Sequence, residues 1–228
     1  MICLCLETAT ARVGVAVTRD GRLLAETLLD APGGLQNRLL MPELRRLLES
    51  CHLGIEQIDL FACATGPGSF TGIRTGIAAT QGLALAADRP CVGVSTLAML
   101  ALNLPHSAAQ VCPMLDARKQ EVYTALYRVS ELPDLIQPDC AVAPEIFLRT
   151  ITAPTIFLGD GALRYRELIS QTLGSNALFA PPITDTLRAA TGCLLAQAAY
   201  IRGNVVPPAS LLPTYLRLSE AEVARLNK

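Results

Sequence analysis

Short apolar runs and helically spaced leucines alternate along this chain and predict a succession of strands and helices. The first run, residues 2–6, has the length of a strand, and alternating valines predict a second strand over residues 13–17. The Asp20-Gly21 pair predicts a hairpin turn that returns the chain as a third, antiparallel strand over residues 23–29. Leucines at helical spacing then predict an amphipathic helix over residues 39–51.

The central apolar stretch joins a strand, a glycine-rich turn and a helix. Residues 60–64 are typical of a buried strand, which ends at the Gly-Pro-Gly turn of residues 66–68. Ser69 and Thr71 are candidate N-cap residues, so we expect a helix over residues 72–87. This helix is apolar nearly all round, which predicts burial on more than one side. Its interior glycines each cost about 0.5–1 kcal/mol relative to alanine, so we expect a neighbouring helix to approach closely there.

The glycine-rich turn has two interpretations. A strand, a turn and a helix N-terminus together bind anions, because free backbone N–H groups and the helix dipole favour phosphate. Tight packing alone is the alternative, since no Gly-Lys-Ser/Thr motif follows the turn and Arg74 is the one cation that it offers.

The second half of the chain repeats the alternation. We place a domain boundary in the loose stretch around Pro105, which gives an N-terminal subdomain over residues 1–104 and a C-terminal one over residues 105–228, with the last segment, about 213–228, packing back on the first. The predicted elements of the second half are strands over 111–115, 121–127 and 155–158, helices over 144–150, 162–173 and 186–202, and a short final strand and helix. Each half opens with a strand that ends in an acidic residue, Glu7 or Asp116, which predicts a duplicated α/β fold with a cleft between the halves.

Composition indicates a large core and a lightly charged surface. Hydrophobic residues make up 51% of the 228 residues, mean hydropathy is +0.37, and charged residues are 17%, below the ~25% of average chains. We therefore expect a partner to cover part of the surface. The net charge of −1 offers no basic field for nucleic acid, no apolar run reaches the length of a membrane span, and the N-terminus is not a signal peptide.

Eight cysteines occur without any Cys-x-x-Cys pair, and His52 and His106 are the only histidines. Metal ligation normally needs closely spaced pairs of such residues. We expect mostly buried thiols in a reducing cytosol, and no metal site.

Five motifs give the chain a family resemblance. They are Leu6-Glu7-Thr8-Ala9-Thr10, Gly66-Pro67-Gly68-Ser69-Phe70-Thr71-Gly72-Ile73-Arg74, Gly93-Val94-Ser95-Thr96-Leu97, Asp116-Ala117-Arg118 with Glu121-Val122-Tyr123, and Pro213-Thr214-Tyr215-Leu216-Arg217. In this order, and over most of the chain, they resemble the bacterial TsaB (YeaZ) family.

The resemblance implies an actin-like, sugar-kinase-like ATPase fold of two related subdomains with mixed sheets flanked by helices. It implies a cytoplasmic, non-catalytic subunit that pairs with the paralogue TsaD, which transfers threonylcarbamoyl to the adenosine beside the anticodon of certain tRNAs. The small ATPase TsaE joins that complex, tRNA is contacted indirectly, and isolated copies form homodimers. No cofactor is expected to bind tightly; ATP or ADP at the interface with TsaD is the candidate ligand.

The chain departs from the family at the turn that would hold phosphate. Kinases of this fold have Asp and a glycine-containing turn where this chain has Glu7, Thr8, Ala9 and Thr10. This degenerate turn puts nucleotide or metal binding there in doubt. Many relatives have a histidine near Gln36, so no role of that histidine carries over.

The candidate site residues fall into three further groups. The loop residues with a candidate nucleotide contact are Gly66, Pro67, Gly68, Ser69, Phe70, Thr71, Gly72 and Arg74. The cleft charges are Asp116 and Arg118, which either pair with each other or present Arg118 to a phosphate. The expected partner interface, partly exposed, consists of Leu40, Leu44, Leu47, Ile73, Gly76, Ile77, Thr80 and Ala84.

Three function classes stay open. The chain is a subunit that supports TsaD, or a weak nucleotide-binding enzyme of its own, or a glycoprotease-like peptidase. The last would need a nucleophile, a base and an oxyanion site, and the sequence offers no such set.

Overall fold

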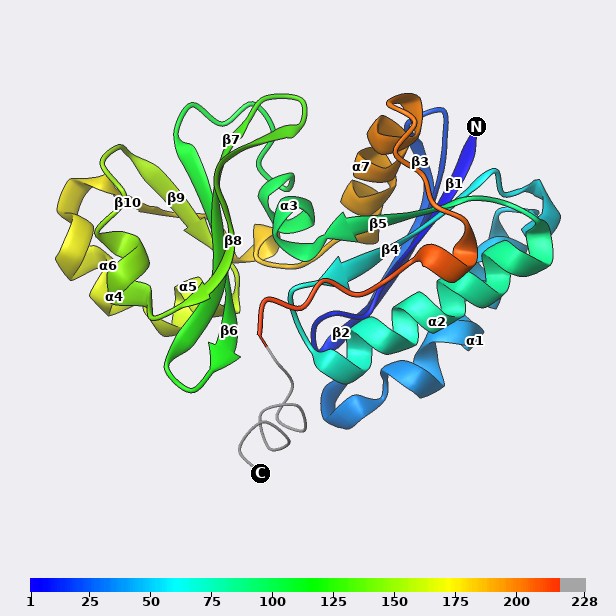
Figure 1. Ribbon diagram of the computed structural model, residues 1–228, viewed down its shortest axis with the longest axis horizontal. Helices are drawn as coiled ribbons and strands as arrows, with labels where there is room; N and C mark the ends of the chain where they lie inside the picture. The colour runs from blue at the N-terminus through cyan, green and yellow to red at the C-terminus, as the bar shows by residue number, and fades with distance from the viewer. Residues whose placement is uncertain (218–228) are drawn as a thin grey trace.

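Two five-stranded sheets form the two lobes of the structure, a computed structural model that describes residues 1–217 (Figure 1). The first sheet has the strand order β3-β2-β1-β4-β5, and the second has the order β10-β9-β6-β7-β8. In each sheet three consecutive strands pair antiparallel, and two later strands add in parallel on the other side of the first one. The lobes therefore repeat one topology, which confirms the predicted fold of two related halves with mixed sheets.

The first sheet follows the hydrophobic pattern closely. Its strands are β1 (Ile2–Glu7), β2 (Arg12–Arg19), β3 (Arg22–Asp30), β4 (Leu60–Gly66) and β5 (Cys91–Ser95). The predicted turn between β2 and β3 is present, with φ of 49° at Asp20 and 78° at Gly21. The parallel strands need crossover helices. These are α1 (Gln36–Ser50) and α2 (Phe70–Ala87), which lie side by side on one face of the sheet (Figure 1).

The second sheet contains two strands that the sequence pattern did not predict. Its members are β6 (Gln110–Arg118), β7 (Glu121–Val129), β8 (Pro133–Val142), β9 (Thr155–Leu158) and β10 (Ala177–Phe179). β8 escaped prediction because it begins with Pro133 and contains Pro138, which an edge strand tolerates. β10 has only three residues and is the other edge.

The shorter helices are α3 (Thr96–Ala101), α4 (Pro144–Leu148), α5 (Asp160–Arg164) and α6 (Arg166–Leu173). Ser95 caps α3, since its hydroxyl oxygen accepts a hydrogen bond from the Ala98 N–H at 3.3 Å. The single helix predicted over residues 162–173 is wrong, because the chain breaks at Tyr165, whose φ of −104° and ψ of 20° are not helical.

The helix α7 (Ala189–Ile201) lies beyond the predicted boundary at residues 104 and 105, yet it packs on β1, β2, β4 and β5 of the first sheet. It covers the face opposite to α1 and α2 (Figure 1). Gly192 permits this approach, because a Cβ atom built on it would lie 2.5 Å from Cys5 Sγ. The first lobe is thus made of two separate stretches of the chain.

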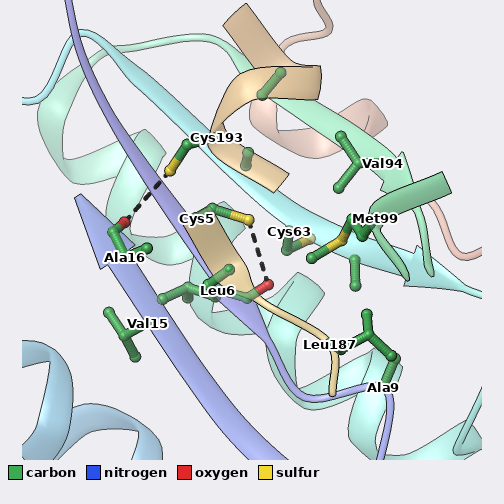
Figure 2. Packing of buried hydrophobic residues seen from close by; sticks show 14 of the residues in the cluster. Cys5, Leu6, Ala9, Val15, Ala16, Cys63, Val94, Met99, Leu187 and Cys193 are labelled. Atoms are coloured by element: carbon green, nitrogen blue, oxygen red, sulfur yellow. Dashed lines mark hydrogen bonds between the residues drawn. The ribbon is translucent and has the colours of Figure 1, made fainter. Parts of the chain in front are cut away.

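Small thiols fill much of the core under α7. Cys5, Cys63 and Cys193 are buried and pack together with Met99 (Figure 2). The thiol of Cys193 donates to the carbonyl oxygen of Ala16 at 3.5 Å. Six of the eight cysteines are buried, as the sequence predicts, and no described residues form a group of three or more His, Cys, Asp or Glu side chains that could hold a metal ion.

After α7 the chain returns over the first lobe as a largely extended segment, residues 205–217, interrupted by a 3-10 helix at Pro208–Ser210; we call it the C-terminal strap (Figure 1). Val206 exchanges two backbone hydrogen bonds with Cys91 of β5, both 2.9 Å long. The predicted final strand is not formed within residues 211–217, and the predicted final helix lies outside the described residues. None of the helices within residues 1–217 has the length and apolar character needed to span a membrane.

Candidate functional site

A cleft of about 980 Å³ separates the two lobes. The first lobe lines it with the turn after β1, the start of α2 and the loop before α1. The second lobe contributes the hairpin between β6 and β7, and the C-terminal strap crosses the mouth. The cleft charges Asp116 and Arg118 and most of the predicted loop residues therefore lie around one space.

The turn after β1 is occupied by a carboxylate of the chain itself. Glu7 is fully buried, and its Oε1 accepts a hydrogen bond from the Ala9 N–H at 2.6 Å. Its Oε2 lies 3.4 Å from the hydroxyl of Thr10. Burial raises the pKa of Glu7 to about 7, although these hydrogen bonds and the nearby Arg12 lower it in part. The side chain that replaces the usual aspartate thus folds back into the turn.

Gly72 and Gly76 of α2 make room for the turn after β1 and not for a neighbouring helix, so the predicted close approach of a helix is wrong at these two glycines. A Cβ atom on Gly72 would lie 1.9 Å from the carbonyl oxygen of Thr8, and one on Gly76 would lie 2.5 Å from the Thr8 hydroxyl oxygen. That hydroxyl donates to the carbonyl oxygen of Gly72 at 2.7 Å. Since the helix backbone rests directly on the end of β1, any side chain at these two positions would displace it.

The amides at the start of α2 are partly used for packing. The predicted cap at Ser69 is present, with its hydroxyl oxygen 3.2 Å from the Gly72 N–H that donates to it. The Ser69 N–H donates to the carbonyl oxygen of Ala9 at 2.7 Å. A Cβ atom on Gly66 would meet the carbonyl oxygen of Thr214 at 2.6 Å. These contacts favour the tight-packing interpretation of the glycine-rich turn.

Arg74 is held by aromatic rings at the mouth of the cleft. Its guanidinium lies 3.8 Å from the centroid of the Phe70 ring, and its Nε donates to the hydroxyl of Tyr215 at 2.8 Å. The rings of Phe70 and Tyr215 stack with centroids 5.0 Å apart. Arg74, the candidate phosphate-binding cation of the glycine-rich turn, therefore anchors the strap to α2.

The two cleft charges pair, but a third residue binds more closely. Asp116 Oδ2 lies 3.4 Å from Arg118 Nη1 and 2.7 Å from Arg164 Nη1. This carboxylate raises the pKa of Arg164 through a hydrogen bond and through its charge. Sequence reasoning missed Arg164, because 48 residues separate it from its partner. The side chain of Arg118 stays 83% exposed.

The hairpin that carries Arg118 has an unusual backbone. Arg118, Lys119 and Gln120 all have positive φ, between 50° and 62°. Such residues are uncommon outside glycine, and three in succession make a tight turn that directs Arg118 and Lys119 toward the cleft. The sequence gives no sign of this turn, since it contains neither Gly nor Asn.

All eight residues of the predicted partner interface are buried inside this chain, so the partial exposure expected for that surface is not observed. They are Leu40, Leu44, Leu47, Ile73, Gly76, Ile77, Thr80 and Ala84. α2 instead exposes Arg74, Ala78, Gly82 and Leu85, the last with 74% of its surface accessible. No described atom lies within 4 Å of a Cβ built on Gly82. A helix that is apolar all round has no polar face to orient it, so the sequence could not distinguish the two sides.

α1 extends this exposed surface. The hydroxyl of Thr75 on α2 donates to the side-chain oxygen of Asn37 on α1 at 2.5 Å, which fixes the two helices side by side. Met41 is 48% exposed, and Arg45 is also exposed. We call Met41, Arg45, Ala78, Gly82 and Leu85 the outer helical face.

Comparisons with known proteins give the relatives of this chain. A family model described as "TsaD: tRNA N6-adenosine threonylcarbamoyltransferase" matches residues 37–225. The chain is 30% identical to the tRNA threonylcarbamoyladenosine biosynthesis protein TsaB of Bacillus subtilis, over 97% of this chain and 96% of that one. It is similar to the solved structure of YeaZ from Pseudomonas aeruginosa, with a TM-score of 0.81 and 32% identity over 94% of this chain and 99% of that one.

A more distant structure supports the fold alone. The ethanolamine utilization protein EutJ from Carboxydothermus hydrogenoformans has a TM-score of 0.53 and 15% identity, and the match covers 86% of this chain and 90% of that one. The two lobes thus have the actin-like, sugar-kinase-like ATPase fold that the sequence motifs imply.

Proposed function

Since the chain belongs to the TsaB (YeaZ) family of tRNA threonylcarbamoyladenosine biosynthesis proteins, we propose that it serves that pathway as a non-catalytic subunit paired with TsaD. Involvement in tRNA threonylcarbamoyladenosine biosynthesis follows from the family. The proposal adds that TsaE joins the complex in the cytoplasm and that tRNA is contacted through TsaD. It also adds that the isolated chain forms a homodimer.

One observation carries the non-catalytic part of the proposal. The turn after β1, which would hold phosphate in an active member of this fold, is filled by the carboxylate of Glu7. A phosphate group there would have to displace this buried side chain from the Ala9 N–H and would lie beside a group of the same charge sign. The turn therefore does not fit a nucleotide phosphate, and we derive no phosphoryl chemistry from it.

The outer helical face supports the pairing. It combines an exposed leucine, Leu85, with an exposed glycine in the helix interior, Gly82. A glycine there costs the helix about 0.5–1 kcal/mol relative to alanine, and no contact within the described chain offsets this cost. Small residues allow the backbone of another helix to come close, and exposed apolar side chains favour a partner that covers them. A helix pair of TsaD would meet both conditions.

Co-purification with TsaD tests the proposal directly. We would run this chain alone and mixed with TsaD from the same organism on size-exclusion chromatography with light scattering, and assay tRNA modification on the fractions. We expect a heteromeric species, and transfer by TsaD only in fractions that contain it. Separate elution, together with ATP hydrolysis by this chain alone, would contradict the proposal.

Leu85→Asp should weaken the pairing with TsaD by at least tenfold and leave the monomer folded. The side chain is 74% exposed, so aspartate costs the monomer little, whereas in the complex its charge would be buried without a counterion. The matched control is Leu163→Asp on α5, where the leucine is 66% exposed on the other lobe. Titration of both variants against TsaD measures the effect, and equal affinities would exclude α2 as the contact.

A weak nucleotide site in the cleft is the second candidate, and the exposed Arg118 favours it. ATP or ADP could then bind at the interface with TsaD, with Arg118 as a phosphate contact. Arg118→Ala should leave assembly with TsaD unchanged and reduce tRNA modification in the assembled complex. Retained modification would assign Arg118 to its structural pairing with Asp116, since both residues belong to one hairpin.

A peptidase function has the least support. His52 and His106 do not line the cleft, and the Ser69 hydroxyl is used to cap α2. Among the described residues of the cleft there is accordingly no histidine to activate a hydroxyl nucleophile.

A further inference from the structure

The C-terminal strap is fastened to the first lobe at several points along its length. It pairs with β5 at Val206, and its Leu211 is buried, with the carbonyl oxygen accepting from the side chain of Gln81 at 3.0 Å. The Thr214 N–H donates to the carbonyl oxygen of Thr65 at 2.8 Å. Tyr215 then stacks on Phe70 of α2. Up to Tyr215 the strap is an integral part of the first lobe.

The end of the described strap crosses the cleft to the second lobe. Arg217 Nη2 lies 3.1 Å from Glu121 Oε2, and Arg217 Nη1 donates to the carbonyl oxygen of Ala117 at 3.1 Å. Both partners belong to the hairpin between β6 and β7, on which Arg118 and Lys119 face the cleft. The planar guanidinium of Arg217 therefore contacts both strands of that hairpin. Figure 1 shows the strap ending between the two lobes.

A second connection joins the lobes through α3. The Ser95 hydroxyl, at the end of β5, donates to Asp139 Oδ2 on β8 at 2.7 Å, and the buried Tyr127 hydroxyl donates to Asp139 Oδ1 at 2.9 Å. Close by, the side-chain amide of Asn103 donates to the carbonyl oxygens of Thr184 and Thr186, at 2.8 and 2.7 Å. The Asp139 bonds join the two lobes directly, and the Asn103 bonds hold together the two stretches of chain that run between the lobes, which makes this the hinge side of the molecule.

We propose that residues 214–217 form an interlobe latch, in which Arg217 holds the hairpin between β6 and β7 against the first lobe, and that its release lets the lobes reorient about the hinge. Ion pairs between side chains that solvent reaches contribute little free energy, and Arg217 and Glu121 are 31% and 35% exposed, so this contact is readily broken. Release would free the hairpin that carries Arg118 and widen the mouth of the cleft. The latch is independent of the proposed pairing with TsaD, because it lies within one chain.

Five tyrosines make the latch testable by fluorine NMR of the protein labelled with 3-fluorotyrosine. Tyr215 lies in the latch, Tyr123 lines the cleft, and Tyr127 lies at the interlobe contact of the hinge. Tyr200 on α7 lies within the first lobe and serves as the reference, whereas Tyr165 borders the same hollow as Glu121, the partner of Arg217, and reports local changes only. Tyrosine-to-phenylalanine variants assign the five resonances.

Arg217→Ala should shift or broaden the resonances of Tyr215, Tyr123 and Tyr127, and leave that of Tyr200 in place. Tyr127 decides the question, because its hydroxyl shares Asp139 with Ser95 of the other lobe and responds when the lobes move. If Tyr215 and Tyr123 change but Tyr127 does not, the contact is local packing and the latch is overturned. Arg45→Ala, which removes an ion pair within α1, is the matched control and should change none of them.

If Arg217→Ala disturbs the fold, the Tyr165 and Tyr200 resonances will collapse together. A milder variant then tests the latch. Glu121→Gln keeps the shape of the side chain and removes the charge that Arg217 meets. We expect the same three resonances to change by a smaller amount. An unchanged Tyr127 resonance in this variant, with the reference signal intact, would also overturn the latch.

Discussion

Glu7→Gln is expected to stabilise the protein by about 3 kcal/mol at pH 8 and by less than about 1 kcal/mol at pH 5. Burial raises the pKa of Glu7 from 4.5 to about 7, and a shift of that size corresponds to about 3 kcal/mol. The folded protein binds this proton more tightly than the unfolded chain does. The contribution of Glu7 to stability is therefore full below pH 4.5 and is lost as pH rises through 7.

Glutamine preserves the local hydrogen bonds without the charge. Its carbonyl oxygen can accept from the Ala9 N–H as Glu7 does, and its amide can donate to the Thr10 hydroxyl. Urea unfolding of both proteins at pH 5, 6, 7 and 8 measures the difference. Glu131→Gln is the control, because Glu131 is exposed and its substitution should leave the free energy of unfolding nearly unchanged. Parallel curves for the wild type and Glu7→Gln would show that the carboxyl group titrates normally.

Gly72→Ala should destabilise the fold by about 2–3 kcal/mol, the upper part of the range for overpacking a core. The added methyl group would lie 1.9 Å from the carbonyl oxygen of Thr8, which is backbone and cannot turn aside. The matched substitution is Gly82→Ala on the same helix, where the added methyl meets nothing in the described chain. There the better helix propensity of alanine should stabilise the protein by about 1 kcal/mol.

Thermal and urea unfolding of the two alanine variants should therefore move in opposite directions. For a chain of this length a change of 1 kcal/mol shifts the midpoint of thermal unfolding by about 2–4 °C, which is readily measured. Shifts of the same sign would mean that Gly72 and Gly82 have similar surroundings, and would contradict the packing of α2 on the turn after β1.

The fold was largely predictable because its central strands are short apolar runs bounded by clear turns. The run that became β4 and the Asp20-Gly21 turn are examples, and both are found where the pattern predicts them. β8 was not predictable, because two prolines and several exposed positions hide an edge strand. The position of α7 was not predictable either, because the sequence of a helix rich in small residues does not indicate which sheet the helix packs on.

The candidate site was predictable in its location but not in its contacts. The repetition of a strand that ends in an acidic residue predicted a cleft between the halves, and the turn after β1 and the end of β6 do line it. The repetition could not reveal that Arg164 binds Asp116 or that Arg217 reaches Glu121, since sequence spacing holds no information on pairs so far apart. The inverted assignment of the two faces of α2 has a different origin, because a helix that is apolar nearly all round has no polar face to orient it.

The discontinuous first lobe also constrains how the chain matures on the ribosome. Its sheet is complete at Ser95, but α7, which covers one face of that sheet, is synthesised about a hundred residues later. Until then Cys5, Cys63 and their neighbours on that face lack their cover. The second sheet, residues 110–179, is by contrast contiguous and emerges whole. Since contiguous units generally fold first during synthesis, we expect the C-terminal lobe to acquire its native packing earlier than the N-terminal one.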